Sequence, residues 1–282
     1  MRQSSRLLAQ FVFFLLQNPF LKNFFTGKIY QGKIKFLCTP GLNCYSCPAA
    51  AVSCPIGAAQ FFLSGVKTNI SLYITGFLMI TGVMFGRFIC SYVCPMGLLQ
   101  DILYRIKSPK LVTRFRFLRY TKYVILVFFV ILLPLIAVHE LSGIGEPWFC
   151  KYICPSGTIF GALPLLLAND FLRQLIGSQF IFKVTIAAGI VLSAVFIYRI
   201  FCRVLCPLGA IYALFNKISI LRIHCDKEKC LSCGNCSKEC QILITPYEQP
   251  NSPECIRCGK CVNACGSKAL SYKMPVTSSR GK

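Results

Sequence analysis

The sequence predicts a mainly α-helical membrane protein with about four transmembrane helices in two parallel repeats, short re-entrant or interfacial helices, and a small C-terminal α+β domain. The first observation is composition: 55% of the residues are hydrophobic, only 14% are charged, and the mean hydropathy is +0.60. The second is an internal repeat of apolar segments. The third is nineteen cysteines, most of them in short fixed spacings. Such a composition lies outside the usual range of soluble domains.

Four apolar segments approach the length of roughly 20 residues that a helix needs to cross a bilayer. Pro19 interrupts the first one, which could lie in the membrane interface instead, and which we interpret as an anchor. Two further apolar stretches, Gly57–Gly65 and Gly157–Ala168, follow Cys-Pro-x-Gly motifs and are too short to cross, so we expect re-entrant or interfacial helices. The four predicted spans are Leu7–Phe25, Ile70–Phe88, Tyr123–Val138 and Ile181–Phe201.

The loop Arg105–Lys122 is rich in lysine and arginine and contains no acidic residue, which predicts a cytoplasmic position for it. The expected location is therefore the cell membrane, in several passes, with the C-terminal domain in the cytoplasm. Four lysines conflict with this orientation, because they would lie outside: Lys22, Lys28, Lys33 and Lys35. The net charge is +22, and much of the basic charge flanks predicted spans, so we expect contact with membrane lipid and no nucleic acid.

Eight cysteines near the C-terminus form two copies of the pattern C-x2-C-x2-C-x3-C. This spacing is the iron–sulfur run of two-cluster bacterial ferredoxins, in which the fourth cysteine of each run binds the other cluster. We therefore divide the chain into a predicted transmembrane domain over 1–218 and a predicted ferredoxin-type 2x[4Fe–4S] domain over 219–282, with iron bound through the cysteines. The predicted ligands are Cys230, Cys233, Cys236 and Cys265 for cluster 1, and Cys255, Cys258, Cys261 and Cys240 for cluster 2.

Three cysteine pairs of the form C-x3-C-P lie among the apolar segments, in repeats near 38–106 and 148–218. Four cysteines, two from each repeat, fall at the predicted cytoplasmic ends of spans and suit one [4Fe–4S] cluster. The inner membrane cluster is predicted at Cys90, Cys94, Cys202 and Cys206.

Five cysteines fall toward the outer face, one more than a single cluster needs, and Cys38 could join them. Any four could bind, and we favour the set Cys47, Cys54, Cys150 and Cys154. Structural zinc and a disulfide among Cys38, Cys44 and Cys47 are the alternatives. The candidates for the outer membrane cluster are Cys44, Cys47, Cys54, Cys150 and Cys154.

Basic residues accompany these pairs and would compensate the negative charge of a cluster held by four thiolates. Arg87, Arg199 and Arg203 lie beside the inner pairs, and Lys151 lies inside the outer pair. Snorkelling to the membrane edge is the alternative explanation of these positions, and the two are compatible. His139 and Glu140 end the third predicted span and could pass protons for a quinone.

The segments GRFICSYVCPMGLLQD, NCYSCPAAAVSCPIG and FCRVLCPLG, followed by the double cysteine run, resemble the NapH/NosR-type membrane polyferredoxins. The resemblance covers about Gly41 to Gly266 and implies a membrane subunit that relays electrons to a redox partner. Some members carry an extracytoplasmic flavin domain, which this sequence lacks, so a flavin would belong to a partner subunit.

We therefore expect a transmembrane electron transfer subunit that relays single electrons through about four [4Fe–4S] clusters. Its expected partners are other subunits of a membrane redox complex, an acidic cytoplasmic electron carrier and an extracytoplasmic redox partner. Two alternatives remain open: a quinol dehydrogenase subunit of a respiratory reductase complex, and a non-catalytic membrane anchor or assembly factor. Whether the chain is itself an enzyme stays open.

Overall fold

Four Cys-Pro-x-Gly motifs start four of the helical segments. Cys54, Cys94 and Cys206 each have an extended backbone and directly precede helices that begin at the following proline. Proline suits the first position of a helix, because its φ angle is fixed near the helical value and its missing N–H has no partner there. Cys154 ends one helical segment in the same extended conformation and precedes Pro155. Each motif thus places a thiol at the N-terminus of a helix.

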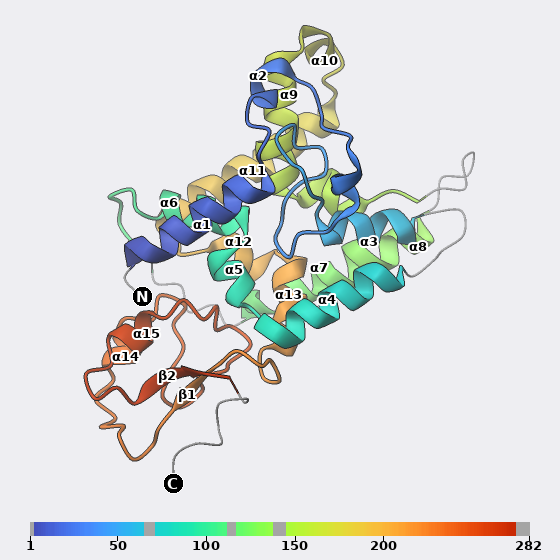
Figure 1. The fold of residues 1–282 in the computed structure, drawn as a ribbon. Helices are drawn as coiled ribbons and strands as arrows, with labels where there is room; N and C mark the ends of the chain where they lie inside the picture. The colour runs from blue at the N-terminus through green and yellow to red at the C-terminus, as the bar shows by residue number, and fades with distance from the viewer. Residues whose placement is uncertain (1–2, 65–70, 112–116, 138–144, 275–282) are drawn as a thin grey trace.

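The computed structural model describes residues 3–64, 71–111, 117–137 and 145–274 (Figure 1). Three helical stretches have π-helical hydrogen bonding: η3 (Leu126–Leu132), η4 (Phe149–Ile153) and η5 (Gly157–Ala162). The other helices are α1 (Gln3–Gln17), α2 (Asn23–Thr26), η1 (Lys33–Phe36), α3 (Pro55–Leu63), α4 (Leu72–Phe85), α5 (Phe88–Tyr92), α6 (Pro95–Leu103), η2 (Phe117–Arg119), α7 (Thr121–Ile125), α8 (Leu133–Ile136), α9 (Leu163–Ala168), α10 (Asp170–Gln174), α11 (Ser178–Phe196), α12 (Ile200–Val204), α13 (Pro207–Phe215), α14 (Asn235–Lys238) and α15 (Lys260–Asn263).

The run α4–α5–α6 has the same plan as the run α11–α12–α13. In each run a long apolar helix ends in a tight turn, a five-residue helix carries the first cysteine, and the second cysteine caps the third helix. Both turns contain a residue with positive φ, Gly86 at 52° and Arg199 at 50°. The turns bring the cysteine pairs of the two runs into one buried core.

The prediction of four membrane-crossing helices was wrong. Among the described residues, only Phe117–Ile136 and Ser178–Phe196 are long and apolar enough to cross a membrane, each with a mean hydropathy of 1.9. The first predicted span ends at Gln17, two residues before Pro19, and the second is shortened to Leu72–Phe85 by the turn at Gly86. Hydropathy counts apolar residues and cannot detect such turns.

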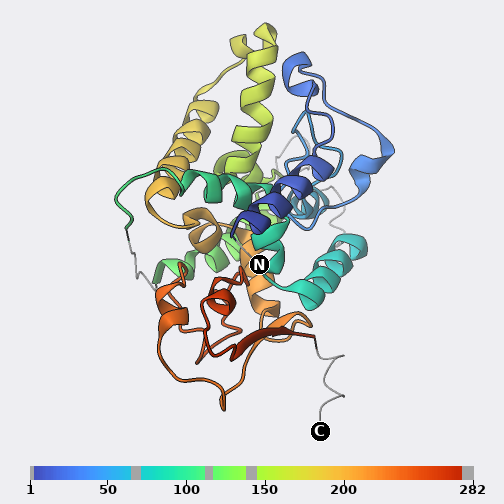
Figure 2. The ribbon, with the colours of Figure 1, turned by 60° about the vertical axis from the view of Figure 1, so that its left-hand side comes forward.

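The C-terminal segment, residues 219–274 of the described chain, lies at the end of the molecule opposite α9 and α10 (Figures 1 and 2). Its strands β1 (Arg222–Cys225) and β2 (Leu270–Lys273) pair antiparallel, with Ile223 opposite Tyr272. A small core joins the segment to the helical part, with Tyr198 packed against Ile242 and Ile256.

Helix α1 has its polar side inward and its apolar side outward. Arg6 and Gln10 are buried, with exposed fractions of 3% and 1%, whereas Leu8 and Leu16 are 65% and 67% exposed. The helix lies against α5 and α6, where its polar side chains find partners. A helix of a protein in water places its apolar side against the core, so α1 has the reverse arrangement.

Candidate functional site

Four buried cysteines from the two matching helix runs share one core: Cys90, Cys94, Cys202 and Cys206, here called the inner site. Burial, followed by the neighbouring thiols of Cys202, Cys90 and Cys94, raises the pKa of Cys206 well above its ordinary value. Burial likewise raises the pKa of Cys202 to about 12. The other three thiols therefore lie near enough to Cys206 to oppose its ionisation, and a bound metal would remove this penalty because it deprotonates its thiol ligands.

Two arginines cross between the halves of the inner site in a reciprocal manner. Arg87, three residues before Cys90, donates through Nη2 to the carbonyl oxygen of Cys202 at 2.9 Å. Arg199, three residues before Cys202, donates through Nη1 to the carbonyl oxygen of Cys90 at 2.6 Å. Both guanidinium groups are fully buried. The arginines thus fix each cysteine pair to the opposite half of the molecule.

Further donors reach three of the inner-site sulfurs. The amide of Leu42 donates to Cys94 Sγ at 3.4 Å, and the amide of Gly209 donates to Cys206 Sγ at 3.3 Å. The Nε2 atom of Gln100 donates to Cys202 Sγ at 3.1 Å. Hydrogen bonds to sulfur are among the features that tune iron–sulfur clusters, so the donors present fit a thiolate-bound cluster.

The outer site brings Cys44 together with Cys54, Cys150 and Cys154. Cys44 Sγ lies 3.6 Å from the position that a Cβ atom would take on Gly157, in the motif that follows Cys154. Burial, followed by the thiol of Cys44, raises the pKa of Cys154 to about 11. Burial also raises the pKa of Cys150 well above its ordinary value, with contributions from Cys154, Cys54 and Cys44.

Two other cysteines lie near the outer site, and the thiol of Cys44 contributes to the raised pKa of one of them, Cys47. The thiol of Cys47 donates to Asn18 Oδ1 at 3.7 Å. Cys38 forms an isolated bridge with Ser53, and its amide donates to the Tyr73 hydroxyl. All nineteen cysteines are free thiols, so no disulfide links Cys38, Cys44 and Cys47 in the structure.

A lysine other than Lys151 faces the outer site. Lys151 Nζ donates to both carboxylate oxygens of Glu146 at 2.6 Å, so its charge is already paired. Lys183 lies within α11, and its Nζ is 3.4 Å from the Cβ position of Gly157, next to Cys44 Sγ. Its charge opposes the rise in pKa of Cys150 and Cys154.

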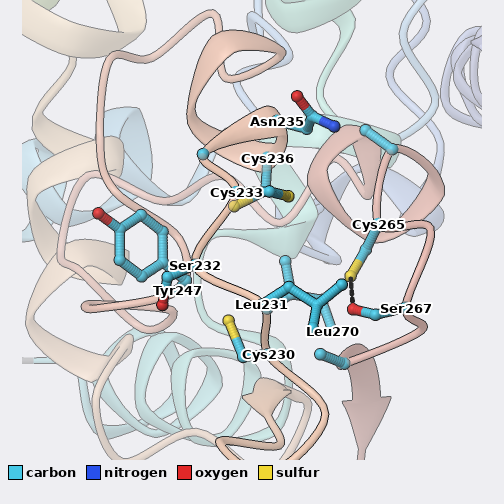
Figure 3. A pocket seen from close by; sticks show the side chains of 13 residues that line it. Cys230, Leu231, Ser232, Cys233, Asn235, Cys236, Tyr247, Cys265, Ser267 and Leu270 are labelled. Atoms are coloured by element: carbon cyan, nitrogen blue, oxygen red, sulfur yellow. Dashed lines mark hydrogen bonds between the residues drawn. The ribbon is translucent and has the colours of Figure 1, made fainter.

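The C-terminal cysteines separate into two sets, and the fourth cysteine of each run lies in the set formed by the other run. Cys230, Cys233, Cys236 and Cys265, the first C-terminal set, line one pocket, with Tyr247 at its rim (Figure 3). The second C-terminal set is Cys240, Cys255, Cys258 and Cys261. Burial raises the pKa of Cys255 to about 12, and the thiols of Cys258 and Cys240 contribute to the rise. Cys225 lies beside Cys230, whose thiol contributes to its raised pKa.

The two C-terminal sets differ in their surroundings. Cys233 of the first set is the one cysteine among the nineteen that is exposed. The second set faces the helical part, where Cys240 and Cys258 pack beside Tyr104 and Tyr198. The hydroxyl of Tyr92, in the helix of Cys90, donates to the carbonyl oxygen of Cys258 at 3.5 Å.

Within the described residues, no three His, Cys, Asp or Glu side chains lie close enough to hold a single metal ion. A four-iron cluster binds one thiolate at each iron, so its ligands stand further apart than those of one ion. The sets of four thiols, the sulfur-directed donors and the buried cations fit such a cluster. His139 and Glu140, proposed for quinone chemistry, lie outside the described residues.

Four residues that contact the cysteine sites or their arginines were missed by sequence reasoning: Leu42, Asp101, Lys183 and Glu254. Lys183 could have been found, because it is a lone cation within an apolar helix, a position that is usually functional. Asp101 is an acid in the amphipathic helix after the first inner pair, and Glu254 directly precedes a cysteine ligand candidate. Nothing in the sequence indicates the amide contact of Leu42.

Comparison with known proteins gives three matches to one family model, described as a 4Fe-4S binding domain, at residues 70–116, 123–173 and 180–224. Together they cover about half of the chain, and each contains one C-x3-C-P pair. The two parallel repeats of the predicted fold class are thus replaced by three units. The last match ends at residue 224, so none of the three covers the cysteine runs of the C-terminal segment, where the fold-class prediction placed an α+β ferredoxin domain; that prediction is wrong on this point also.

The protein YccM of Escherichia coli, named as a candidate electron transport protein, is 27% identical over 64% of this chain, which spans about half (48%) of YccM. The methylamine utilization ferredoxin-type protein MauN of Methylorubrum extorquens is 28% identical over 69% of the chain and 63% of its own length. An uncharacterized protein of Methanocaldococcus jannaschii is 26% identical over 77% of the chain and 76% of its own length. No solved structure shows a significant match.

Proposed function

This chain belongs to the family of 4Fe-4S binding domains, and from this membership we propose that it relays single electrons along four sets of four cysteines. Binding of 4Fe–4S clusters and a role in electron transport follow from the family and its named relatives. The observation that carries the finer proposal is the inner site, to which two matched segments each contribute one cysteine pair.

The first C-terminal set, the second C-terminal set, the inner site and the outer site would each hold one cluster. A [4Fe–4S] cluster supplies one-electron redox chemistry. The protein supplies the ligands, excludes water through burial and places cations beside the inner and outer sites. We propose Cys44, Cys54, Cys150 and Cys154 as the outer ligands, because the Cys47 thiol donates to Asn18.

Protein contacts support an order for the four sets. The exposed Cys233 makes the first C-terminal set the entry or exit point for a redox partner. Tyr92 connects the second set to the helix of Cys90. Leu42 connects the inner site to the outer one, since its amide donates to Cys94 Sγ and its carbonyl accepts from the Ser156 hydroxyl at 3.5 Å.

We propose that the helical part lies in a membrane. Support comes from the two candidate membrane helices and from helix α1, whose apolar side faces outward and whose polar side is buried. Large apolar side chains are also exposed on other helices, including Leu72 at 85% and Leu167 at 75%. A lipid environment removes the cost of exposing them to water, which is about 25 cal/mol per Å² of apolar surface.

The partners of such a relay are other subunits of a membrane redox complex and a soluble electron carrier that docks beside Cys233. The sequence on either side of Cys233 has mixed charge: Lys227, Lys229 and Lys238 alternate with Glu228 and Glu239, all exposed. A carrier that binds there needs groups of both signs, and a uniformly acidic face fits it poorly.

The test of the inner site uses two cysteines far apart in sequence. Cys90→Ala and Cys202→Ala should each abolish the same EPR signal of the reduced protein, because both thiols bind one cluster. Cys225→Ala is the matched control and should keep every signal, since Cys225 belongs to no set. Loss of two different signals in the two variants, or of none, would overturn the proposed inner site.

A further inference from the structure

The two crossing arginines of the inner site have matching ion networks. Arg199 donates to Asp101 through Nε at 2.9 Å and through Nη2 at 2.6 Å. A second cation, Arg6, binds the same carboxylate at 3.1 Å. Asp101 is itself buried, so this group contains two cations and one anion away from water.

Arg87 has the equivalent arrangement on the other half. Its Nη1 donates to Glu254 Oε2 at 3.1 Å and to the carbonyl oxygen of Pro253 at 3.0 Å. Lys122 is the second cation and binds Glu254 Oε1 at 2.6 Å. Lys122 and Arg87 are both fully buried, and Glu254 is 8% exposed.

The networks differ in where the carboxylate comes from. Asp101 belongs to α6, in the same helix run as Cys90 and Cys94. Glu254 belongs to the C-terminal segment and directly precedes Cys255 of the second C-terminal set. The carboxylate that compensates the charge of Arg87 is therefore in place when the C-terminal segment, which carries Cys255, packs against the helical part.

We propose that Glu254 is a positioning residue through which the docked C-terminal segment sets the reduction potential of the inner site. This inference rests on the proposed function, because it requires a cluster at the inner site. A fixed negative charge near a cluster disfavours the extra electron, and a fixed positive charge favours it, so local charge tunes the potential. In the low-dielectric interior such charges act with little screening.

The sign of the effect separates this role from a merely structural one. Glu254→Gln removes a negative charge and should raise the midpoint potential of the inner site. Lys122→Gln removes a positive charge from the same ion group and should lower it. Local disorder would move both variants in one direction. Glu248→Gln, an exposed carboxylate of the same segment, is the matched control and should leave the potential unchanged.

The experiment is an EPR-monitored redox titration of the full chain, with the inner-site signal identified as the one that Cys90→Ala lacks. Glu254→Asp should return the potential toward that of the natural protein, because it restores the charge. Equal potentials in the Glu254→Gln and natural proteins, or shifts of the same sign in Glu254→Gln and Lys122→Gln, would overturn the inference. If Cys90→Ala lacks no signal, the proposed function fails instead, so the two failures are distinguishable.

Discussion

Asp101→Asn should be one of the most destabilising single substitutions in the helical part. The carboxylate accepts from Arg199 at 2.6 and 2.9 Å, from Arg6 at 3.1 Å and from Gln10 at 3.0 Å. Two unit charges about 4 Å apart attract by about 4 kcal/mol at an effective dielectric constant of about 20. Removing one partner of a buried pair costs about 3–5 kcal/mol, because the other charge is left uncompensated.

The chain offers a matched control in Asp170→Asn. Asp170 forms an ion pair of similar length with Arg173, 3.0 Å, but its side chain is 90% exposed, against 2% for Asp101. Exposed pairs of this kind contribute about 0.3–0.5 kcal/mol. Both variants make the same chemical change. The difference between their losses of stability therefore reports the effect of burial and of the number of partners.

The assay is chemical unfolding of the purified protein in detergent, followed by the helical circular dichroism signal. The midpoint of Asp101→Asn should fall far below that of Asp170→Asn. Burial opposes ionisation of Asp101, but Arg199 and Arg6 outweigh it and hold its pKa below the ordinary value. The stability that this carboxylate contributes should therefore persist at neutral pH and be lost only in acid, below a pH of about 4. Equal midpoints for the two variants would refute the reasoning.

Three further predictions concern the cysteine sites. Cys44→Ala should remove one cluster signal from the EPR spectrum and Cys47→Ala should keep it; the opposite pattern would exclude Cys44 as a ligand. Lys183→Met should lower the potential of that same signal in a redox titration, because a cation next to Cys44 is lost. Lys151→Met should shift it less, because the side chains of Lys151 and its partner Glu146 are 32% and 36% exposed and solvent screens them; equal shifts would count against a specific role of Lys183. Gly97→Ala should destabilise the fold by about 1–3 kcal/mol, since a Cβ there would lie 2.6 Å from the Cys90 carbonyl oxygen. Its control is Gly189→Ala, which has open space around it and should be neutral or stabilise helix α11 by about 0.5–1 kcal/mol. Thermal unfolding compares the two variants, and an unchanged melting temperature in Gly97→Ala would contradict the tight packing.

The grouping of the cysteines could be predicted because it depends on local rules that the chain repeats. The spacing C-x3-C-P places one thiol in a short helix and the next at the N-terminus of the following helix, and this arrangement recurs at Cys90/Cys94 and Cys202/Cys206. The exchange of Cys240 and Cys265 between the C-terminal runs could be predicted from the spacing of those runs. The structure brings together the thiols of the inner site and those of the two C-terminal sets, but at the outer site it places Cys44, and not the favoured Cys47, beside Cys150 and Cys154. Cluster binding at each set stays a prediction.

Long-range features could not be predicted. The spacing Cys44-x2-Cys47 leaves both thiols equally placed in the sequence, and only the packing of Gly157 against Cys44 and of Asn18 against Cys47 separates them. Glu254 is paired with Arg87, 167 residues away. The number of membrane helices was overestimated, because hydropathy does not register where turns such as that at Gly86 end a helix.

The central claim is that four sets of four cysteines each hold one [4Fe–4S] cluster. Its most direct test is the content of iron and acid-labile sulfide in the purified chain, measured per polypeptide. The account predicts about sixteen of each, four for every cluster. About eight of each would contradict it, because no more than two of the four sets would then carry a cluster.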